Sequence, residues 1–173
     1  MTSFNKIVHF SNINPCLRAW VEVNPAAIEA NTKVVKSVLF ASCALMAVVK
    51  ADGYGHGAIT VAKAVLRGGA QSLGVATLQE GIEIRTKYKN ESIYVLNGID
   101  DNQINLFKTK NLIPILNSKK EVSIVLRKKI KFGIHIDTGI NRLGIEDINY
   151  LKKNLLNSNY LVIILSHLAS ADE

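Results

Sequence analysis

The segment with the clearest chemical potential is AVVKADGYGHG, residues 47–57, in which an apolar run ends at Lys50. The run predicts a strand, and functional residues of parallel α/β folds gather where strands end. A lysine amine in that position can act as a nucleophile or base, as Schiff-base chemistry with an aldehyde cofactor requires. The glycines permit close backbone approach to a bound group, and Tyr54 can donate its hydroxyl to a phosphate. A lysine that only extends from a strand end into solvent is the alternative.

Two further segments leave predicted strands with polar side chains. The first, HIDTGINRLG over residues 135–144, carries Arg142, whose rigid guanidinium fork suits a carboxylate or a phenolic oxygen. The second, SHLASADE over residues 166–173, carries His167, which can pack over a cofactor ring or hydrogen-bond to it. The plainer alternatives are a surface arginine after a loop and a histidine with its hydrogen bonds satisfied at a strand end.

These segments must be positioned by an alternation of short apolar strands and amphipathic helices. Pro25 suits the first position of a helix that we expect to reach about Val38. Two more helices are expected, and Thr77 with Glu80 forms the capping box that opens the second. They cover Ala58 to Arg67 and Thr77 to Lys87. The expected strands are an early one over Ala19 to Val23, then Leu45 to Val49, Leu73 to Ala76, Ile93 to Leu96, Ile113 to Leu116, Phe132 to Ile136 and Leu161 to Leu165.

The spacing of the six later strands predicts a parallel α/β fold. Their starts lie roughly 20–29 residues apart, which suits one strand and one returning helix per unit. An open doubly wound sheet for nucleotides should show G-x-G-x-x-G after its first strand, and ADGYGHG does not match. We therefore predict an incomplete (β/α)8 TIM-type barrel of about six strand–helix units, occupying residues 1–173 as one partial domain.

The composition of the chain argues against several classes of function. The chain has 173 residues and a formal net charge of +7, much of it between Lys119 and Lys131. That basic stretch lacks interleaved aromatics and predicts a solvated helix face, so we expect no nucleic-acid partner. The most apolar run, residues 37–49, is too short to span a bilayer, and the start lacks a secretory signal. Cys16 and Cys43 show no metal-type spacing, so we expect no metal, reduced thiols and a cytoplasmic location.

Taken together, AVVKADGYGHG, HIDTGINRLG and SHLASADE resemble, in order and spacing, the amino-terminal barrel of bacterial alanine racemases of PLP fold type III. RAWVEVNPAAIEAN near the start and LGVATLQEGIEIR, residues 73–85, resemble further parts of that barrel. The resemblance covers nearly the whole chain after about residue 17 and is most specific at the lysine motif. It implies the cofactor pyridoxal 5'-phosphate (PLP), the substrate alanine and a role in supplying D-alanine for peptidoglycan.

The same resemblance assigns roles to individual residues. The lysine matching Lys50 binds PLP covalently and serves as one of two bases at the substrate Cα. The tyrosine matching Tyr54 binds the cofactor phosphate, and the histidine matching His167 lies near the cofactor ring. The arginine matching Arg142 contacts the substrate carboxylate and the phenolic oxygen of the cofactor.

The sequence departs from the family pattern in two respects. Many members have a lysine, often carbamylated, where this chain has His135, and that lysine helps to hold the arginine. His135 cannot form the carbamate, which leaves open how Arg142 is positioned. The family also continues beyond the point matching Glu173, through further strands and a carboxyl-terminal β domain that brings the second base, a tyrosine, to the partner subunit. On this basis we expect residues 1–173 alone to be inactive or to need a complementing fragment, and a homodimer is possible.

Two other functions stay open from the sequence. One is a PLP-binding protein without racemase activity, similar to the single-domain PLP homeostasis proteins that share this barrel type. Those proteins complete their barrel, and their motifs differ from YGHG and DTGINRLG. The other is a non-catalytic remnant of a degenerating gene, which would show no cooperative melting transition.

Overall fold

The six predicted strands form one parallel sheet. The computed structural model describes residues 21–155 and 157–171, and every neighbouring pair of strands in that part is parallel. The order along the sheet is the order along the chain, so each strand lies beside the one before it. The strands are β1 (Met46–Val48), β2 (Ser72–Val75), β3 (Ser92–Val95), β4 (Ile113–Leu116), β5 (Phe132–Ile136) and β6 (Leu161–Ser166).

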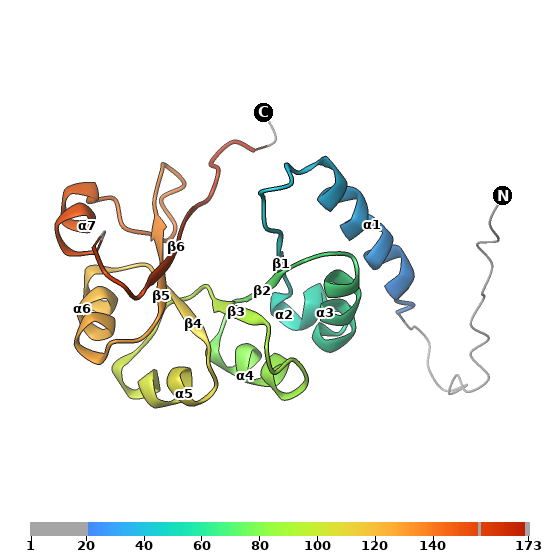
Figure 1. The fold of residues 1–173 in the computed structure, drawn as a ribbon, viewed down its shortest axis with the longest axis horizontal. Helices are drawn as coiled ribbons and strands as arrows, with labels where there is room; N and C mark the ends of the chain where they lie inside the picture. Colours follow the sequence, from blue (N-terminus) through green and yellow to red (C-terminus); the bar gives the residue numbers. More distant parts are fainter. Residues whose placement is uncertain (1–20, 156, 172–173) are drawn as a thin grey trace.

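Helices connect the strands and lie on one side of the sheet. Figure 1 shows the strands following an arc, with α3 to α7 along its outer side and the arc open between β6 and β1. This is the incomplete TIM-type barrel that the strand spacing predicts, and the prediction is confirmed. The helices are α1 (Pro25–Val38), α2 (Lys50–Tyr54), α3 (Ala58–Arg67), α4 (Leu78–Lys87), the 3-10 helix η1 (Asp101–Gln103), α5 (Ile104–Thr109), α6 (Lys119–Lys128) and α7 (Ile148–Asn154).

The helix boundaries follow from local caps. The Asn24 side chain accepts hydrogen bonds from the Ala26 and Ala27 amides, and proline occupies the first turn of α1. The predicted capping box of Thr77 and Glu80 is present at the start of α4. An equivalent box opens α6. Because side chains satisfy these amides, α1, α4 and α6 each begin at a defined residue.

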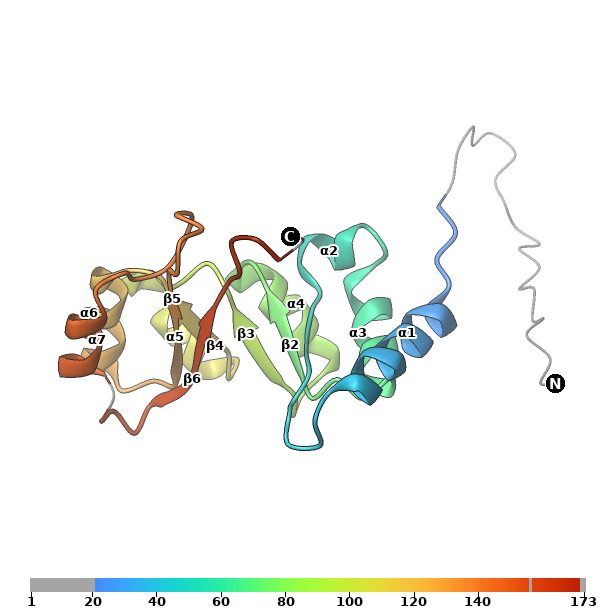
Figure 2. The same cartoon turned by 90° about the horizontal axis from the view of Figure 1, so that it is seen from above.

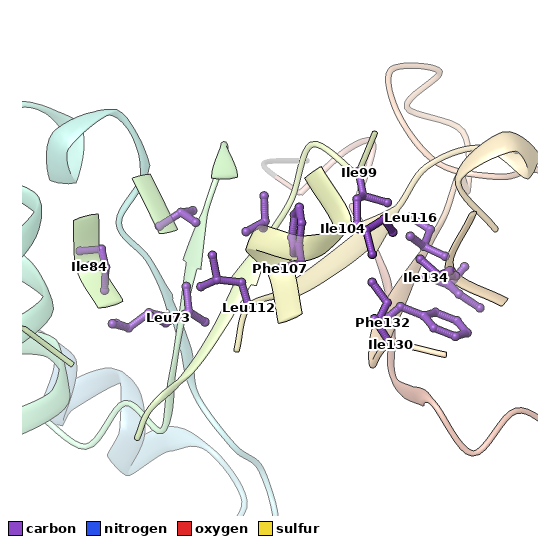
Figure 3. Packing of buried hydrophobic residues seen from close by; sticks show 14 of the residues in the cluster. Leu73, Ile84, Ile99, Ile104, Phe107, Leu112, Leu116, Ile130, Phe132 and Ile134 are labelled. Atoms are coloured by element: carbon purple, nitrogen blue, oxygen red, sulfur yellow. The ribbon is translucent and has the colours of Figure 1, made fainter. Parts of the chain in front are cut away.

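The core lies between the sheet and its outer helices. Its strand side chains are fully buried isoleucine, leucine, valine and phenylalanine, and α4, α5 and α6 supply the opposing layer (Figure 3). Strands β2, β4 and β5 are buried on both faces and read as continuous apolar runs, which is why their pattern was legible in the sequence. Among the largest fully buried side chains are Leu73, Ile84, Ile93, Phe107, Ile115, Leu116, Phe132 and Ile134.

We expect Phe107→Ala to destabilise the fold by about 3–5 kcal/mol, because the substitution leaves a cavity beneath α5. Phe107 is 1% exposed and packs in the central cluster. The neighbouring Leu106 is 43% exposed on the same helix, so Leu106→Ala is the matched control and should cost far less. Urea unfolding monitored by circular dichroism measures both, and equal losses would contradict the assignment of Phe107 to the core.

The predicted early strand over Ala19 to Val23 is not formed in the part of it that the structure describes. Residues 19 and 20 lie outside the described residues, and residues 21–23 have no regular secondary structure. Val21 is 77% exposed. An alternating pattern makes a strand only where a neighbouring strand supplies hydrogen bonds, and the described sheet begins at β1 and offers this segment none.

The basic stretch is confirmed as a solvated surface. Lys119, Lys120, Arg127, Lys128 and Lys129 are all exposed on α6 or just beyond it. Within the described ranges no helix is both long and apolar enough to cross a membrane.

Candidate functional site

A cavity of about 520 Å³ lies at the carboxyl edge of the sheet. Its volume falls within the range of small-molecule sites. Figure 2 shows α2 and the loop after β5 at this same edge. The cavity is lined by apolar side chains with several polar groups between them. The lining residues are Met46, Val48, Lys50, Tyr54, Ala76, Leu96, Asn97, Ile115, His135, Arg142, Leu143, Ile163, Leu165 and His167.

The structure brings all four predicted site residues to this one cavity. Lys50 begins α2, with one residue between it and the end of β1, and Tyr54 ends the same helix. Arg142 belongs to the loop after β5, and His167 follows β6. The Lys50 Nζ atom lies 6.0 Å from the centre of the Tyr54 ring. Because parallel strands all point the same way, residues far apart in the chain meet where the strands end.

The backbone after Lys50 forms a left-handed turn. Ala51, Asp52, Gly53 and Tyr54 all have φ between 50° and 62°. Three of these residues carry side chains, for which the left-handed region costs about 1–2 kcal/mol per residue. Such strain persists only where surrounding contacts determine the conformation, and it concentrates at functional sites. The turn directs the chain sharply back toward α3 and leaves the Lys50 side chain on the cavity wall.

Two carboxylates hold this turn in place. One oxygen of Glu80 accepts the Ala51 amide at 2.8 Å, while the other accepts the Ala76 amide at 2.7 Å. The Asp52 carboxylate accepts the Ala58 amide at 2.6 Å and so fixes the start of α3. Sequence reasoning identified Glu80 only as a member of a capping box. Its contact with Ala51, 29 positions away, had no signal in the sequence.

We expect Glu80→Ala to destabilise the chain by about 1–3 kcal/mol, because the amides of Ala51 and Ala76 lose their acceptor. The freed turn should also slow covalent uptake of an aldehyde by Lys50. Urea unfolding and the rate of borohydride-fixed PLP incorporation measure the two effects. Glu83→Ala is the matched control, since Glu83 is exposed on the same helix. If both variants react with PLP at the wild-type rate, Glu80 has no part in positioning the lysine.

The loop that carries Arg142 is tied to both flanking strands. The Asp137 carboxylate accepts the Gly139 and Asn141 amides, and the Gly139 hydrogen bond is the main reason that the pKa of Asp137 lies below its usual value. The Thr138 hydroxyl lies 2.6 Å from that of Ser166 on β6. The Ile145 amide donates to the carbonyl of His135 at 2.9 Å. These bonds fold the loop back over the end of β5.

His135 is the buried polar residue of the cavity wall. It is 6% exposed, and its Nδ1 lies 3.0 Å from the Asn117 side-chain oxygen. Burial lowers the pKa of His135, the Asp137 charge opposes that shift, and His167 and Arg142 add to it. Among the described residues, its Nε2 is the one buried side-chain nitrogen or oxygen without a hydrogen-bond partner.

The fold and the cavity define a class: a portion of a TIM-type barrel whose polar site lies at the carboxyl ends of its strands. The profile of the family described as alanine racemase, N-terminal domain, matches residues 23–173. The chain therefore belongs to the alanine racemase family, of which it represents the amino-terminal part.

Individual relatives support this family assignment. An alanine racemase of Prochlorococcus marinus is 46% identical over 174 residues, covering 94% of this chain and 45% of the relative. An alanine racemase of a Synechocystis strain is 36% identical, covering 90% of this chain and 45% of the relative. The chain thus spans less than half the length of these relatives.

Solved structures show the same fold. The alanine racemase from Bacillus anthracis with bound L-Ala-P has 31% identity and a TM-score of 0.78, covering 89% of this chain and 42% of that one. The alanine racemase from Bartonella henselae, which contains covalently bound pyridoxal phosphate, has 31% identity and a TM-score of 0.74 over 85% and 44% of the two chains. The family is PLP-dependent.

The residues present fit this cofactor. Covalent binding of an aldehyde requires a primary amine, and Lys50 is the lysine on the cavity wall. A phosphate and a phenolic oxygen need donors, which the Tyr54 hydroxyl and the Arg142 guanidinium can supply. The planar ring needs apolar surroundings, and most of the remaining lining is aliphatic.

Proposed function

We propose that this chain forms the PLP-binding part of an alanine racemase, which interconverts L-alanine and D-alanine. The observation that carries the proposal is the single cavity shared by Lys50, Tyr54, Arg142 and His167. An amine, a phenol, a guanidinium and an imidazole converging on one apolar cavity suit an anionic aldehyde cofactor and an amino-acid substrate.

Each residue has a distinct role in this proposal. When bound, PLP accommodates the electron pair left at the substrate Cα as its proton departs. Lys50 holds the cofactor and carries the Cα proton on one side of the substrate. Tyr54 donates to the cofactor phosphate, Arg142 binds the substrate carboxylate, and His167 lies beside the cofactor ring. The apolar walls exclude water from the reacting carbon.

The proposal also covers the partners of this chain and its location in the cell. Because the matched region covers 45% of the relatives' length, we propose that racemisation needs the remaining portion as well. That portion would provide the second base. It would be a continuation of this chain, a separate complementing fragment or part of a homodimer. We also propose a cytoplasmic role in supplying D-alanine for peptidoglycan, in keeping with the free thiol of Cys43.

Uptake of the cofactor tests the first part of this proposal. The full chain is mixed with PLP, reduced with borohydride, digested and analysed by mass spectrometry. We expect the phosphopyridoxyl group on the peptide that contains Lys50. Uniform labelling of exposed lysines, or no cooperative unfolding transition, would favour a remnant without a cofactor site.

Alanine racemisation tests the second part. The chain is measured alone and after addition of the carboxyl-terminal portion of the Prochlorococcus relative. We expect D-alanine formation only in the combined sample. Specific PLP uptake without racemisation in either sample would favour a non-catalytic PLP-binding protein.

A further inference from the structure

His56, the histidine of the ADGYGHG segment, has no role in the proposed function. It is exposed and does not belong to the cavity lining. Its ring nevertheless has a defined place, because the Nδ1 atom lies 3.0 Å from the carbonyl oxygen of Tyr54 and 3.2 Å from that of Gly53. These two contacts join the histidine to the turn that carries the proposed phosphate-binding tyrosine.

The two carbonyl oxygens decide which nitrogen of the His56 ring carries the proton. A carbonyl oxygen only accepts, so Nδ1 must be the donor to both. In the neutral ring, Nε2 is then the nitrogen without a proton. The turn therefore selects one tautomer of His56.

The hydrogen bonds of His56 support a strained piece of backbone. Tyr54 has a φ of 56°, in the left-handed region that is unfavourable for a residue with a side chain. Such a conformation persists only where surrounding contacts determine it. The backbone amide of His56 also donates to the Gly53 carbonyl at 3.2 Å, so the main chain and the side chain of one residue hold the same turn.

The backbone of Tyr54 in turn sets the place of its ring. The ring is 59% exposed, so neighbouring side chains restrain it little. Its centre lies 6.0 Å from the Lys50 Nζ atom, and both side chains line the cavity. The direction of the backbone at Tyr54 therefore decides whether its hydroxyl can reach the phosphate of an aldehyde that Lys50 holds.

We propose that His56 is a positioning residue for phosphate binding, whose Nδ1–H donates to the carbonyls of Gly53 and Tyr54 and so holds the Tyr54 hydroxyl at the phosphate of the cofactor. In this role His56 acts through Tyr54 and makes no contact with the cofactor itself. The inference rests on the proposed function, in which Tyr54 donates to that phosphate.

Long-range ¹H–¹⁵N NMR spectra of the full chain, recorded without cofactor, test the hydrogen bond. At about pH 9 an imidazole is neutral, and we expect a proton on Nδ1 of His56 and none on Nε2. In urea the preference for this tautomer should be lost, because the turn no longer exists. A proton on Nε2 in the folded chain overturns the inference, whether or not the chain binds PLP.

A comparison of PLP with pyridoxal, the same aldehyde without the phosphate, tests the positioning role. Borohydride-fixed label at Lys50, measured over a range of aldehyde concentrations, gives an apparent Kd for each. We expect His56→Leu to weaken PLP binding about 3–10-fold relative to pyridoxal binding, because one hydrogen bond of the turn is lost. His56→Asn should restore the wild-type ratio, because its amide nitrogen offers a donor close to the place of Nδ1. Equal weakening for the two aldehydes in His56→Leu overturns the positioning role.

Tyr54→Phe separates this inference from the proposed function. We expect it to weaken PLP binding relative to pyridoxal binding, and His56→Leu should add no further change in its background. If the effect of His56→Leu persists in full in Tyr54→Phe, the positioning role is wrong while the proposed function stands. If Tyr54→Phe leaves the ratio unchanged, the phosphate role of Tyr54 is wrong and the positioning role falls with it.

Discussion

Replacing Lys50 with alanine is expected to abolish covalent incorporation of PLP into the cavity. Lys50 is the lysine that lines the cavity, and an aldehyde can be fixed there only through a primary amine. Borohydride reduction followed by peptide mass spectrometry should find the label at residue 50 in the wild type and none there in Lys50→Ala. The absorption band of the lysine-bound cofactor should disappear with it.

Two controls make this result specific. Lys50→Arg keeps the positive charge but offers no primary amine, so it should behave as Lys50→Ala does. Lys63→Ala removes an exposed lysine from α3, outside the cavity, and should keep the label at Lys50. Undiminished specific labelling in Lys50→Ala would move the cofactor site elsewhere and refute the proposed function.

Replacing Gly144 with alanine is expected to destabilise the chain by about 2–6 kcal/mol and to displace the Arg142 loop. Gly144 has a φ of 118°, and a Cβ atom there would lie 2.6 Å from the backbone nitrogen of Asp137. The backbone strain costs about 1–3 kcal/mol, and the overlap with neighbouring main chain adds about 1–3 kcal/mol. Main chain cannot rotate away as a flexible side chain can. Urea unfolding measures the loss.

Gly139 provides the matched control within the same loop. Its φ of 121° is almost the same, but a Cβ atom there would meet nothing within 4 Å. Gly139→Ala should therefore show only the strain component, so the difference between the two variants isolates the steric clash. Equal losses in the two variants would show that the loop does not pack against the end of β5 as described.

The elements of this fold were largely predictable because their signals are local. The capping box at Thr77, the proline in the first turn of α1 and the apolar runs of β4 and β5 each act within a few residues. Strand spacing then indicates a barrel-type sheet, since each returning helix needs a similar length of chain. Residues 21–23, the described part of the predicted early strand, were the exception, because pairing depends on a partner that alternation in the sequence does not reveal.

The sequence by itself therefore determined helices α1, α3 and α4, the six parallel strands and the candidate residues Lys50, Tyr54, Arg142 and His167. Only the tertiary structure decided that these four share one cavity, because that depends on the curvature of the sheet. It also decided that Glu80 accepts the amide of the turn after Lys50 and that the Asn117 side chain lies within hydrogen-bond distance of His135. Such contacts join residues on different strand–helix units, and the geometry that brings them within hydrogen-bond distance exists only once the units have packed.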